Sequence, residues 1–319
     1  MHRRIESAMT MMTDPRHFKL RLFIEGNIIG VATGMVIALF RYLLELSEEY
    51  LPVLYRWLPE HIVWIPVWFL ALFLCSWILY RIVRKDGMTS GSGIPQIKGI
   101  LLGEMDMNWA RVLVLKFTGA VLGIGAGMSL GREGPSVQLG ACLGQGLGRL
   151  KHRSYAESHY LLTAGAGAGL AAAFNAPLAG VIFCLEELTK NFSAFVLMGA
   201  ISAAVTATTV TQYFFGMQPV FHMGVVPVID TGHMYFLLIL LGAFVGLLGL
   251  AFNPMLTRSQ DFYKKVPARW RPVVPLFCAG ILGFVLPQVL GGGSRLVDSL
   301  VVTDYTLAFL VLLLAAKFL

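Results

Sequence analysis

Three short runs in this sequence combine ionisable or hydroxyl side chains with glycine and proline, and each is flanked by apolar stretches. They are Gly91, Ser92, Gly93, Ile94 and Pro95; Gly131, Arg132, Glu133, Gly134 and Pro135; and Asn175, Ala176 and Pro177, which lead into Glu186 and Glu187. Glycine and proline end helices, and a helix that begins within a membrane presents unpaired N–H groups and the positive end of its dipole. Such helix ends attract anions.

The hydroxyl of Ser92 has two possible roles. Beside unpaired backbone amides it would add a weak donor for a chloride ion, which exchanges water for such donors and can leave again. The alternative is a loop serine that hydrogen-bonds to its own backbone. The residues alone leave both interpretations open.

The carboxylates are candidates for proton transfer. An ionisable residue between apolar segments, as Glu133 is, is a candidate functional residue. Burial and a nearby anion both favour its protonated form, so a carboxyl in an anion path links proton uptake to anion movement. A structural ion pair with Arg132 is the alternative, although adjacent helical residues do not face each other. Glu186 and Glu187 close an apolar run and are either a solvated helix end or a proton entry point.

The elements that must position these residues are predicted to be membrane-spanning helices. Of the 319 residues, 56% are hydrophobic and 13% charged, and the mean hydropathy is +0.71. Several stretches approach the roughly 20 apolar residues that a spanning helix needs. We predict spans at 22–40, 62–83, 111–130, 160–185, 194–215, 234–253, 273–290 and 305–319. The span 160–185 is expected to break at Asn175–Pro177, and the run 137–148 is too short to cross.

The net charge of +7 is explained by membrane topology better than by nucleic-acid binding. Basic residues precede the first span and flank later ones, which predicts a cytoplasmic N-terminus in a multi-pass membrane protein. The first 21 residues lack the apolar core of a cleavable signal peptide. The cysteines Cys75, Cys142, Cys184 and Cys278 have no ligand or disulfide spacing and are expected to pack among apolar residues. No cofactor, metal site or enzyme activity is predicted.

A self-comparison indicates two related halves. Gly30, Gly34 and Phe40 recur as Gly242, Gly246 and Phe252; Gly91 and Ser92 as Gly293 and Ser294; and Lys116 and Phe117 as Lys317 and Phe318. We therefore predict a basic N-terminus (1–21), a first repeat (22–215), a connecting loop (216–233) and the start of a second repeat (234–319). Glycines at GxxxG spacing, namely Gly123, Gly127, Gly140, Gly144, Gly165 and Gly169, predict close helix packing.

Taken together, the runs 91–95, 131–135 and 171–180 followed by 185–188 resemble those of the chloride channel and transporter (CLC) family. The resemblance implies an all-α inverted-repeat bundle with broken helices, a homodimer, and transport of chloride and protons across a bacterial inner membrane. It also implies that Ser92 is a chloride ligand within the filter segments 91–95 and 131–135, Glu133 the external gate, and Glu187 the internal proton-transfer residue.

The family's third anion-binding segment, of the form GxFxP, and its later tyrosine ligand are absent from this sequence. Both would fall beyond Leu319, so the second repeat is expected to be truncated. Proton-coupled chloride antiport is the leading hypothesis. A passive chloride channel is one alternative, and a truncated fragment that does not transport is another.

Overall fold

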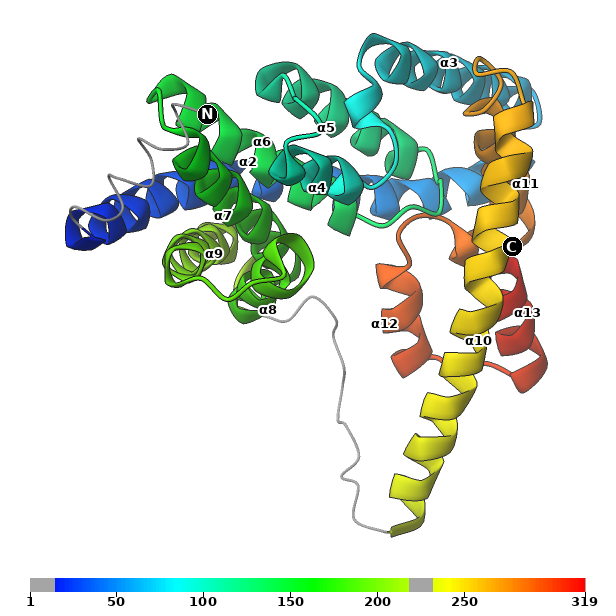
Figure 1. Cartoon of the computed structure of the whole chain (residues 1–319). Coiled ribbons are helices and arrows are strands. Elements are labelled where there is room, and N and C mark those ends of the chain that lie inside the picture. Colours follow the sequence, from blue (N-terminus) through cyan, green and yellow to red (C-terminus); the bar gives the residue numbers. More distant parts are fainter. Residues whose placement is uncertain (1–14, 218–231, 319) are drawn as a thin grey trace.

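The computed structural model describes residues 15–217 and 232–318, and every regular element in these ranges is helical (Figure 1). The longer helices are α2 (Pro15–Trp57), α3 (Trp64–Lys85), α5 (Trp109–Gly125), α6 (Glu133–Leu150), α7 (Tyr155–Phe174), α9 (Ala194–Phe215), α10 (Gly232–Lys265), α11 (Val273–Val285) and α13 (Leu307–Phe318). Short elements between them are η1 (Leu58–Glu60), η2 (Gly87–Thr89), α4 (Ile94–Leu102), α8 (Pro177–Phe183), η3 (Cys184–Thr189), η4 (Pro287–Val289) and α12 (Ser294–Val302). The predicted fold class, an all-α bundle with broken helices, is confirmed.

Four helices in these ranges are long and apolar enough to cross a membrane: 17–60, 64–85, 194–215 and 234–265. The predicted spans 22–40 and 234–253 are too short, because α2 and α10 continue as helix beyond their apolar cores and through Pro52 and Pro254. Residues 1–14 of the predicted basic N-terminus and residues 218–231 of the predicted connecting loop lie outside the described ranges.

The helices α6 and α7 pack with their backbones in contact. A Cβ added at Gly140 would lie 2.0 Å from the carbonyl oxygen of Gly165, and one at Gly144 would lie 2.1 Å from that of Leu161. Close packing is therefore confirmed for Gly140, Gly144, Gly165 and Gly169. The prediction of close helix packing is wrong for Gly127, which lies after the end of α5 in a left-handed turn with φ of +96°.

The helix α2 packs against α9 in the same way. Cβ atoms at Gly30 and Gly34 would lie 2.7 Å and 2.9 Å from carbonyl oxygens of α9. Ala203 and Ala207 are fully buried in this contact, and Ala168 and Ala172 of α7 belong to the same apolar core. Small residues thus bring α2, α6, α7 and α9 close together around one centre.

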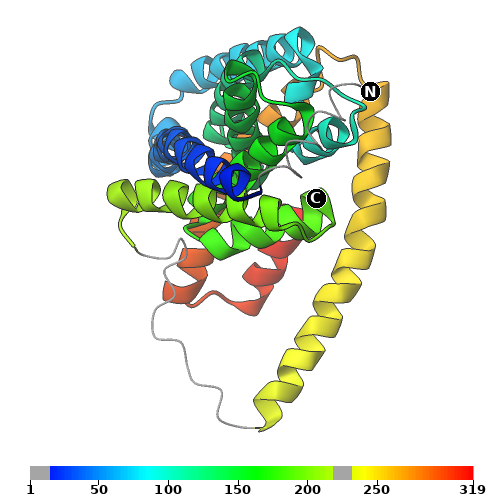
Figure 2. The ribbon, with the colours of Figure 1, turned by 60° about the vertical axis from the view of Figure 1, so that its left-hand side comes forward.

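By contrast, α10 runs along the side of the molecule (Figure 2). Its large apolar side chains, such as Leu237, Leu241 and Leu250, are exposed. None of its most apolar 18-residue window is buried within the described chain. A helix that is apolar and uncovered has the surface that lipid favours.

The cysteine prediction is only partly correct. Cys142 and Cys184 are fully buried among apolar residues. Cys75 is half-buried, and Cys278 is exposed on α11. The apolar run around Cys278 predicts a membrane span, but it does not show whether the Cys278 side chain faces the protein interior. The prediction of burial is therefore wrong for Cys278.

The helix breaks fall where the sequence predicts them. The helix α7 ends before Asn175, which adopts a left-handed conformation with φ of +56°, and α8 begins at Pro177. Asparagine tolerates this conformation and proline starts helices well, so the predicted interruption of 160–185 is confirmed.

A second break is repeated in the other half of the chain. Gly91 and Gly93, with φ of +67° and +94°, precede α4, and Gly291 and Gly293, with φ of +68° and +92°, precede α12. The backbone therefore pairs Gly91 with Gly291, and the predicted pairing with Gly293 is wrong by two residues. Left-handed glycines define this turn, so matching the Gly-Ser letters gave the wrong register.

Candidate functional site

Ser92 lies in the turn between these two left-handed glycines, immediately before α4. A Cβ at Gly93 would lie 2.4 Å from Oε1 of Gln138, so no larger residue fits there. The hydroxyl of Ser92 accepts a hydrogen bond from the backbone N–H of Ile94 at 3.4 Å. This is the local bond of a loop serine, yet accepting it leaves the hydroxyl proton available as a donor. Both roles considered for Ser92 are compatible with this geometry.

The turn is held in place by Lys116, whose side chain is buried within α5. Its ammonium donates to the carbonyl oxygens of Gly91 at 2.6 Å and Thr89 at 3.2 Å. Gln138 of α6 adds a hydrogen bond from its side-chain amide to the carbonyl of Met88 at 2.8 Å. Two neighbouring helices thus fix the backbone immediately before Ser92.

The turn at Ser92 also contacts the beginning of α6. A Cβ at Gly134 would lie 2.6 Å from the carbonyl oxygen of Ser92 and 2.8 Å from its Cα. Since α4 begins at Ile94 and α6 begins at Glu133, two helix N-termini meet at this contact. The unpaired N–H groups and the dipoles of the two helices therefore favour the binding of an anion at this contact.

Glu133 is exposed at the first position of α6 and lines a cavity of about 240 Å³. The other charged residues in the cavity wall are Glu45, Glu48, Arg132 and Lys317. The second half of the chain contributes the turn Gly292–Ser294 to the same wall. Glu133 therefore lies where residues from both halves of the chain meet around an open space.

Arg132 does not form the ion pair considered for it. Its guanidinium lies 5.6 Å from the ring centroid of Phe174, and its Nη2 is buried without a hydrogen-bond partner. Among the described residues, no salt bridge or hydrogen bond joins it to Glu133. Arg132 and Glu133 therefore form no direct ion pair, and only a longer-range charge interaction connects them.

Glu187 lies in η3 and pairs with Lys98, whose ammonium donates a hydrogen bond to its Oε1. This hydrogen bond and the charge of Lys98 hold the pKa of the Glu187 carboxyl below its ordinary value. The pair lines a cavity of about 550 Å³ with Tyr155, His159 and other residues of α7 and α9. Glu186 is exposed and lines neither this cavity nor the one at Glu133.

The helix α4 connects the two parts of the site. Lys98 lies four residues after Ile94, which is about 6 Å along a helix axis. The backbone of Lys98, which pairs with Glu187, is therefore about one helical turn from the N-terminus at which Ser92 and Gly134 meet. Glu133 is at that same N-terminal contact, in a different cavity.

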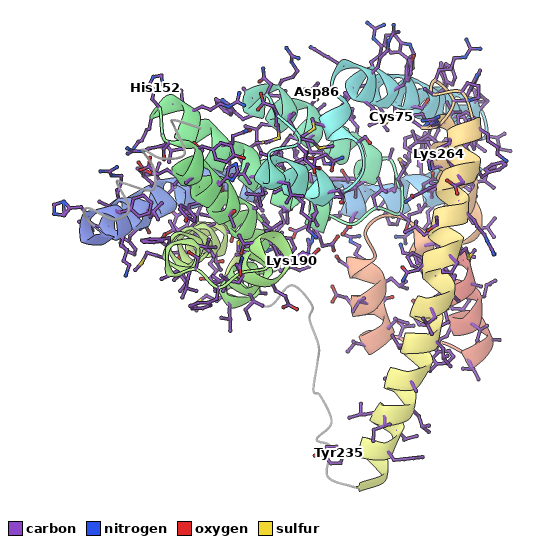
Figure 3. The ribbon with its side chains drawn as sticks, viewed as in Figure 1. Cys75, Asp86, His152, Lys190, Tyr235 and Lys264 are labelled. Atoms are coloured by element: carbon purple, nitrogen blue, oxygen red, sulfur yellow. The ribbon has the colours of Figure 1, made fainter. Side chains whose placement is uncertain are left out.

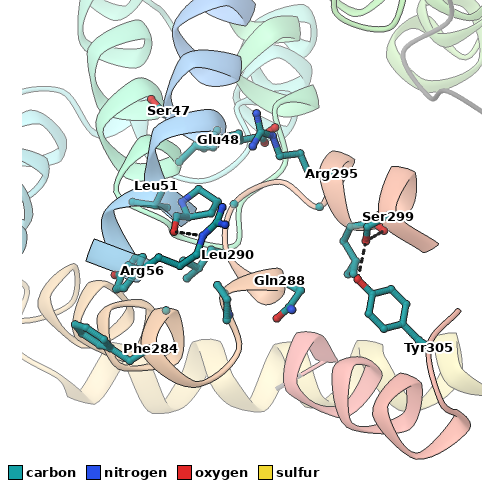
Figure 4. Close-up of a pocket in the computed structure, with 18 residues that line it drawn as sticks. Ser47, Glu48, Leu51, Arg56, Phe284, Gln288, Leu290, Arg295, Ser299 and Tyr305 are labelled. Atoms are coloured by element: carbon teal, nitrogen blue, oxygen red, sulfur yellow. Dashed lines mark hydrogen bonds between the residues drawn. The ribbon is translucent and has the colours of Figure 1, made fainter. Parts of the chain in front are cut away.

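A further cavity of about 440 Å³ lies between α2 and the segment 283–305 (Figure 4). Glu48 lines both this cavity and the one at Glu133. Here Tyr305 donates a hydrogen bond to Oγ of Ser299 at 3.4 Å. None of the residues predicted for the site lines this cavity.

Sequence reasoning missed Lys98, Lys116 and Gln138. An ionisable residue within an apolar helix, such as Lys116, is a functional candidate by itself. The sequence therefore indicated Lys116, but the residue was used only as evidence for the repeat. Lys98 is 89 residues from Glu187 and carried no such signal. Gln138 is recognisable only from its contact with the turn at Gly93.

Comparison with known proteins gives consistent results. Residues 71–319 match the family described as voltage gated chloride channel. The H+/Cl− exchange transporter ClcA of Vibrio cholerae is 35% identical over 309 residues, which cover 91% of this chain and 64% of that protein. The transporter of the same name from Citrobacter koseri is 31% identical and is matched over 65% of its length. The chain thus spans slightly less than two thirds of these relatives.

Among solved structures, a slow cyanobacterial Cl−/H+ antiporter superposes with a TM-score of 0.85 at 28% identity, over 93% of this chain and 72% of that one. A CLC-type fluoride/proton antiporter superposes with a TM-score of 0.77 at 24% identity, over 94% of this chain and 74% of that one. The second likeness concerns the fold alone.

Proposed function

This chain belongs to the voltage gated chloride channel family, and we propose that it exchanges chloride for protons across a membrane. The observation that carries the proposal is the contact between Ser92 and Gly134, where the N-termini of α4 and α6 converge beside the carboxylate of Glu133. The relatives named as H+/Cl− exchange transporters support the same substrates.

At this contact chloride is bound by backbone N–H groups of the segments 91–95 and 131–135, other than the two prolines, together with the hydroxyl of Ser92. Such donors replace the water of the anion without a fixed positive charge at the site. Lys116 and Gln138 position the turn and do not touch the ion. The binding is strong enough to admit an anion and weak enough to release it.

The protons follow a route that begins at Glu187 and ends at Glu133. Glu133 occupies the anion path when charged and leaves it when protonated, so each proton accepted admits an anion. Glu187 takes protons from the cytoplasmic side, and Lys98 sets how readily it does so. The presence of an acid at both ends of the path favours exchange over passive conduction.

We infer that the protein lies in a cell membrane of bacterial type with its N-terminus in the cytoplasm. Basic residues at the start of α2 and at the ends of α3 and α6 support this orientation. The homodimer implied by the family resemblance, and the domain limits given above, stay predictions.

The experiment is a flux assay in liposomes that contain the purified chain, with a chloride electrode and a pH electrode recording together. A second protein, fused to the part of the Vibrio relative that the match leaves uncovered, is assayed in parallel. We expect a chloride gradient to drive protons in the opposite direction in at least one of the two. Chloride movement without proton movement would indicate a passive channel and not an exchanger. If neither protein moved chloride, the proposal would be contradicted.

A further inference from the structure

A cavity of about 230 Å³ opens between the first turns of α2 and the turn that joins α6 to α7. Its wall consists of His17, Leu20, Arg21, Ile24, Glu25, Lys151 and Arg153. The position of this turn can be followed from His152, which is labelled in Figure 3. None of these residues belongs to the proposed chloride and proton path.

The cavity wall carries three cations and one carboxylate. Glu25 is buried, and its Oε1 accepts a hydrogen bond from Nε of Arg153 at 3.0 Å and lies 3.4 Å from the ammonium of Lys151. Arg21 pairs at 3.2 Å with Glu157, which is not one of the residues that line the cavity. The side chains of Arg21 and Lys151 are still 41% and 40% exposed, so both cations can reach an anion in the cavity.

Two apolar side chains complete the wall and begin a longer stripe. Leu20 and Ile24 are 60% and 50% exposed, and Ile28, Val31 and Met35 continue the exposed apolar surface along α2. These residues recur every three or four positions and therefore share one face of the helix. The stripe leads from the cationic cavity directly onto a helix that is long and apolar enough to span a membrane.

We propose that this cavity binds the phosphate headgroup of an anionic phospholipid, with the acyl chains lying along the apolar stripe of α2. Basic cavities at the membrane surface between helices suit such headgroups, and a soluble phosphate would use the cations but not the stripe. The site is independent of the proposed transport, since it shares no residue with it. It ties the first helix of the bundle to the α6–α7 turn through a lipid as well as through Glu25.

The test measures lipid binding to the purified chain in detergent by native mass spectrometry. The probes are a short-chain phosphatidylglycerol, the matching phosphatidylcholine and inorganic phosphate. The variant Arg21→Gln/Lys151→Gln removes the two exposed cations and leaves the buried Arg153–Glu25 pair intact. The control Lys264→Gln/Lys265→Gln removes two exposed cations from the end of α10, outside this cavity.

We expect phosphatidylglycerol to bind more tightly than phosphatidylcholine. The cavity variant should lower the affinity for phosphatidylglycerol about thirty-fold, because it removes two basic residues and each contributes about 1 kcal/mol near an anionic surface. The control should retain the affinity. If the control lost as much affinity for phosphatidylglycerol, the binding would depend on general surface charge and the proposal would be wrong. Equal binding of the two lipids, or inorganic phosphate binding as tightly as the anionic lipid, would overturn the proposal. Thermal unfolding of both variants shows that each is folded.

Discussion

Lys116 and Lys317 make the same pair of hydrogen bonds in the two halves of the chain. Lys116 donates to the carbonyls of Thr89 and Gly91, and Lys317 donates to those of Val289, at 2.7 Å, and Gly291, at 3.0 Å. In each half a lysine from one helix holds the left-handed turn that precedes a nine-residue helix. The second turn has Gly292 where the first has Ser92, so only the first has a hydroxyl at this position.

The variant Lys116→Met should release the turn at Ser92. It keeps the apolar stem but removes both hydrogen bonds, each worth about 1.5–3 kcal/mol when one partner is charged. We expect a lower unfolding temperature and weaker chloride binding by calorimetry. Thr118→Val, which removes a hydrogen bond within the same helix, is the control and should change neither strongly. Unchanged chloride affinity in Lys116→Met would show that the lysine does not position the site.

The variant Glu133→Gln should abolish proton movement while chloride flux continues. A neutral amide cannot carry a proton, and it resembles the protonated side chain that leaves the anion path. Paired chloride and pH recordings in liposomes measure both fluxes. Glu45→Gln removes another carboxylate from the same cavity and should leave protons coupled. Proton pumping by Glu133→Gln in a chloride gradient would contradict the assignment.

The variant Lys98→Met should raise the pH at which Glu187 takes up a proton. Lys98 lowers the pKa of this carboxyl, so the ion pair is present above the ordinary carboxyl range and is lost as the pH falls through the lowered pKa. Infrared titration of the carboxyl band measures the change, and the loss of that band in Glu187→Gln assigns it. If the carboxyl band titrated at the same pH in Lys98→Met, Lys98 would not lower the pKa of Glu187.

The variant Glu187→Gln should also stop proton transfer while chloride still binds, because Glu187 pairs with Lys98 and lines a different cavity from Glu133. Calorimetry measures the binding and the liposome assay the protons. Glu186→Gln is the matched control, since its carboxylate is exposed beside the same helix end. If Glu187→Gln lost chloride binding, this carboxylate would belong to the anion site.

The variant Ser92→Pro should shift the preference from chloride toward nitrate, because it removes the hydroxyl donor between the two helix N-termini. The ratio of chloride to nitrate flux is the measurement. Folding should change little, since hydrogen bonds from Lys116 and Gln138 hold the backbone that precedes Ser92. An unchanged flux ratio would mean that the hydroxyl only serves the local bond to Ile94.

The variant Gly140→Ala should destabilise the bundle, since its Cβ would lie 2.0 Å from the carbonyl oxygen of Gly165. Overpacking of this kind costs about 1–3 kcal/mol or more. Gly199→Ala in α9 is the control, because its Cβ would meet only the Cβ of Ala164, at an ordinary 3.5 Å. Thermal unfolding compares the two, and equal stability would show that α6 and α7 can move apart at no cost.

Much of this protein follows from the sequence alone. Apolar length predicts membrane helices, because hydrocarbon leaves no other partner for backbone polar groups. Glycine, asparagine and proline predict the breaks at Gly93 and Asn175, since their allowed backbone angles are local properties. Ser92, Glu133 and Glu187 are candidates by residue type and position.

Contacts between distant segments required the tertiary structure. The packing of α6 against α4 brings Gly134 against Ser92, and the packing of η3 against α4 brings Glu187 to Lys98. The register of the two halves depended on the backbone angles of Gly91 and Gly291, which no residue letter reports. Side chains that are far apart in the chain meet only when several helices have packed, so no local pattern encodes their partners.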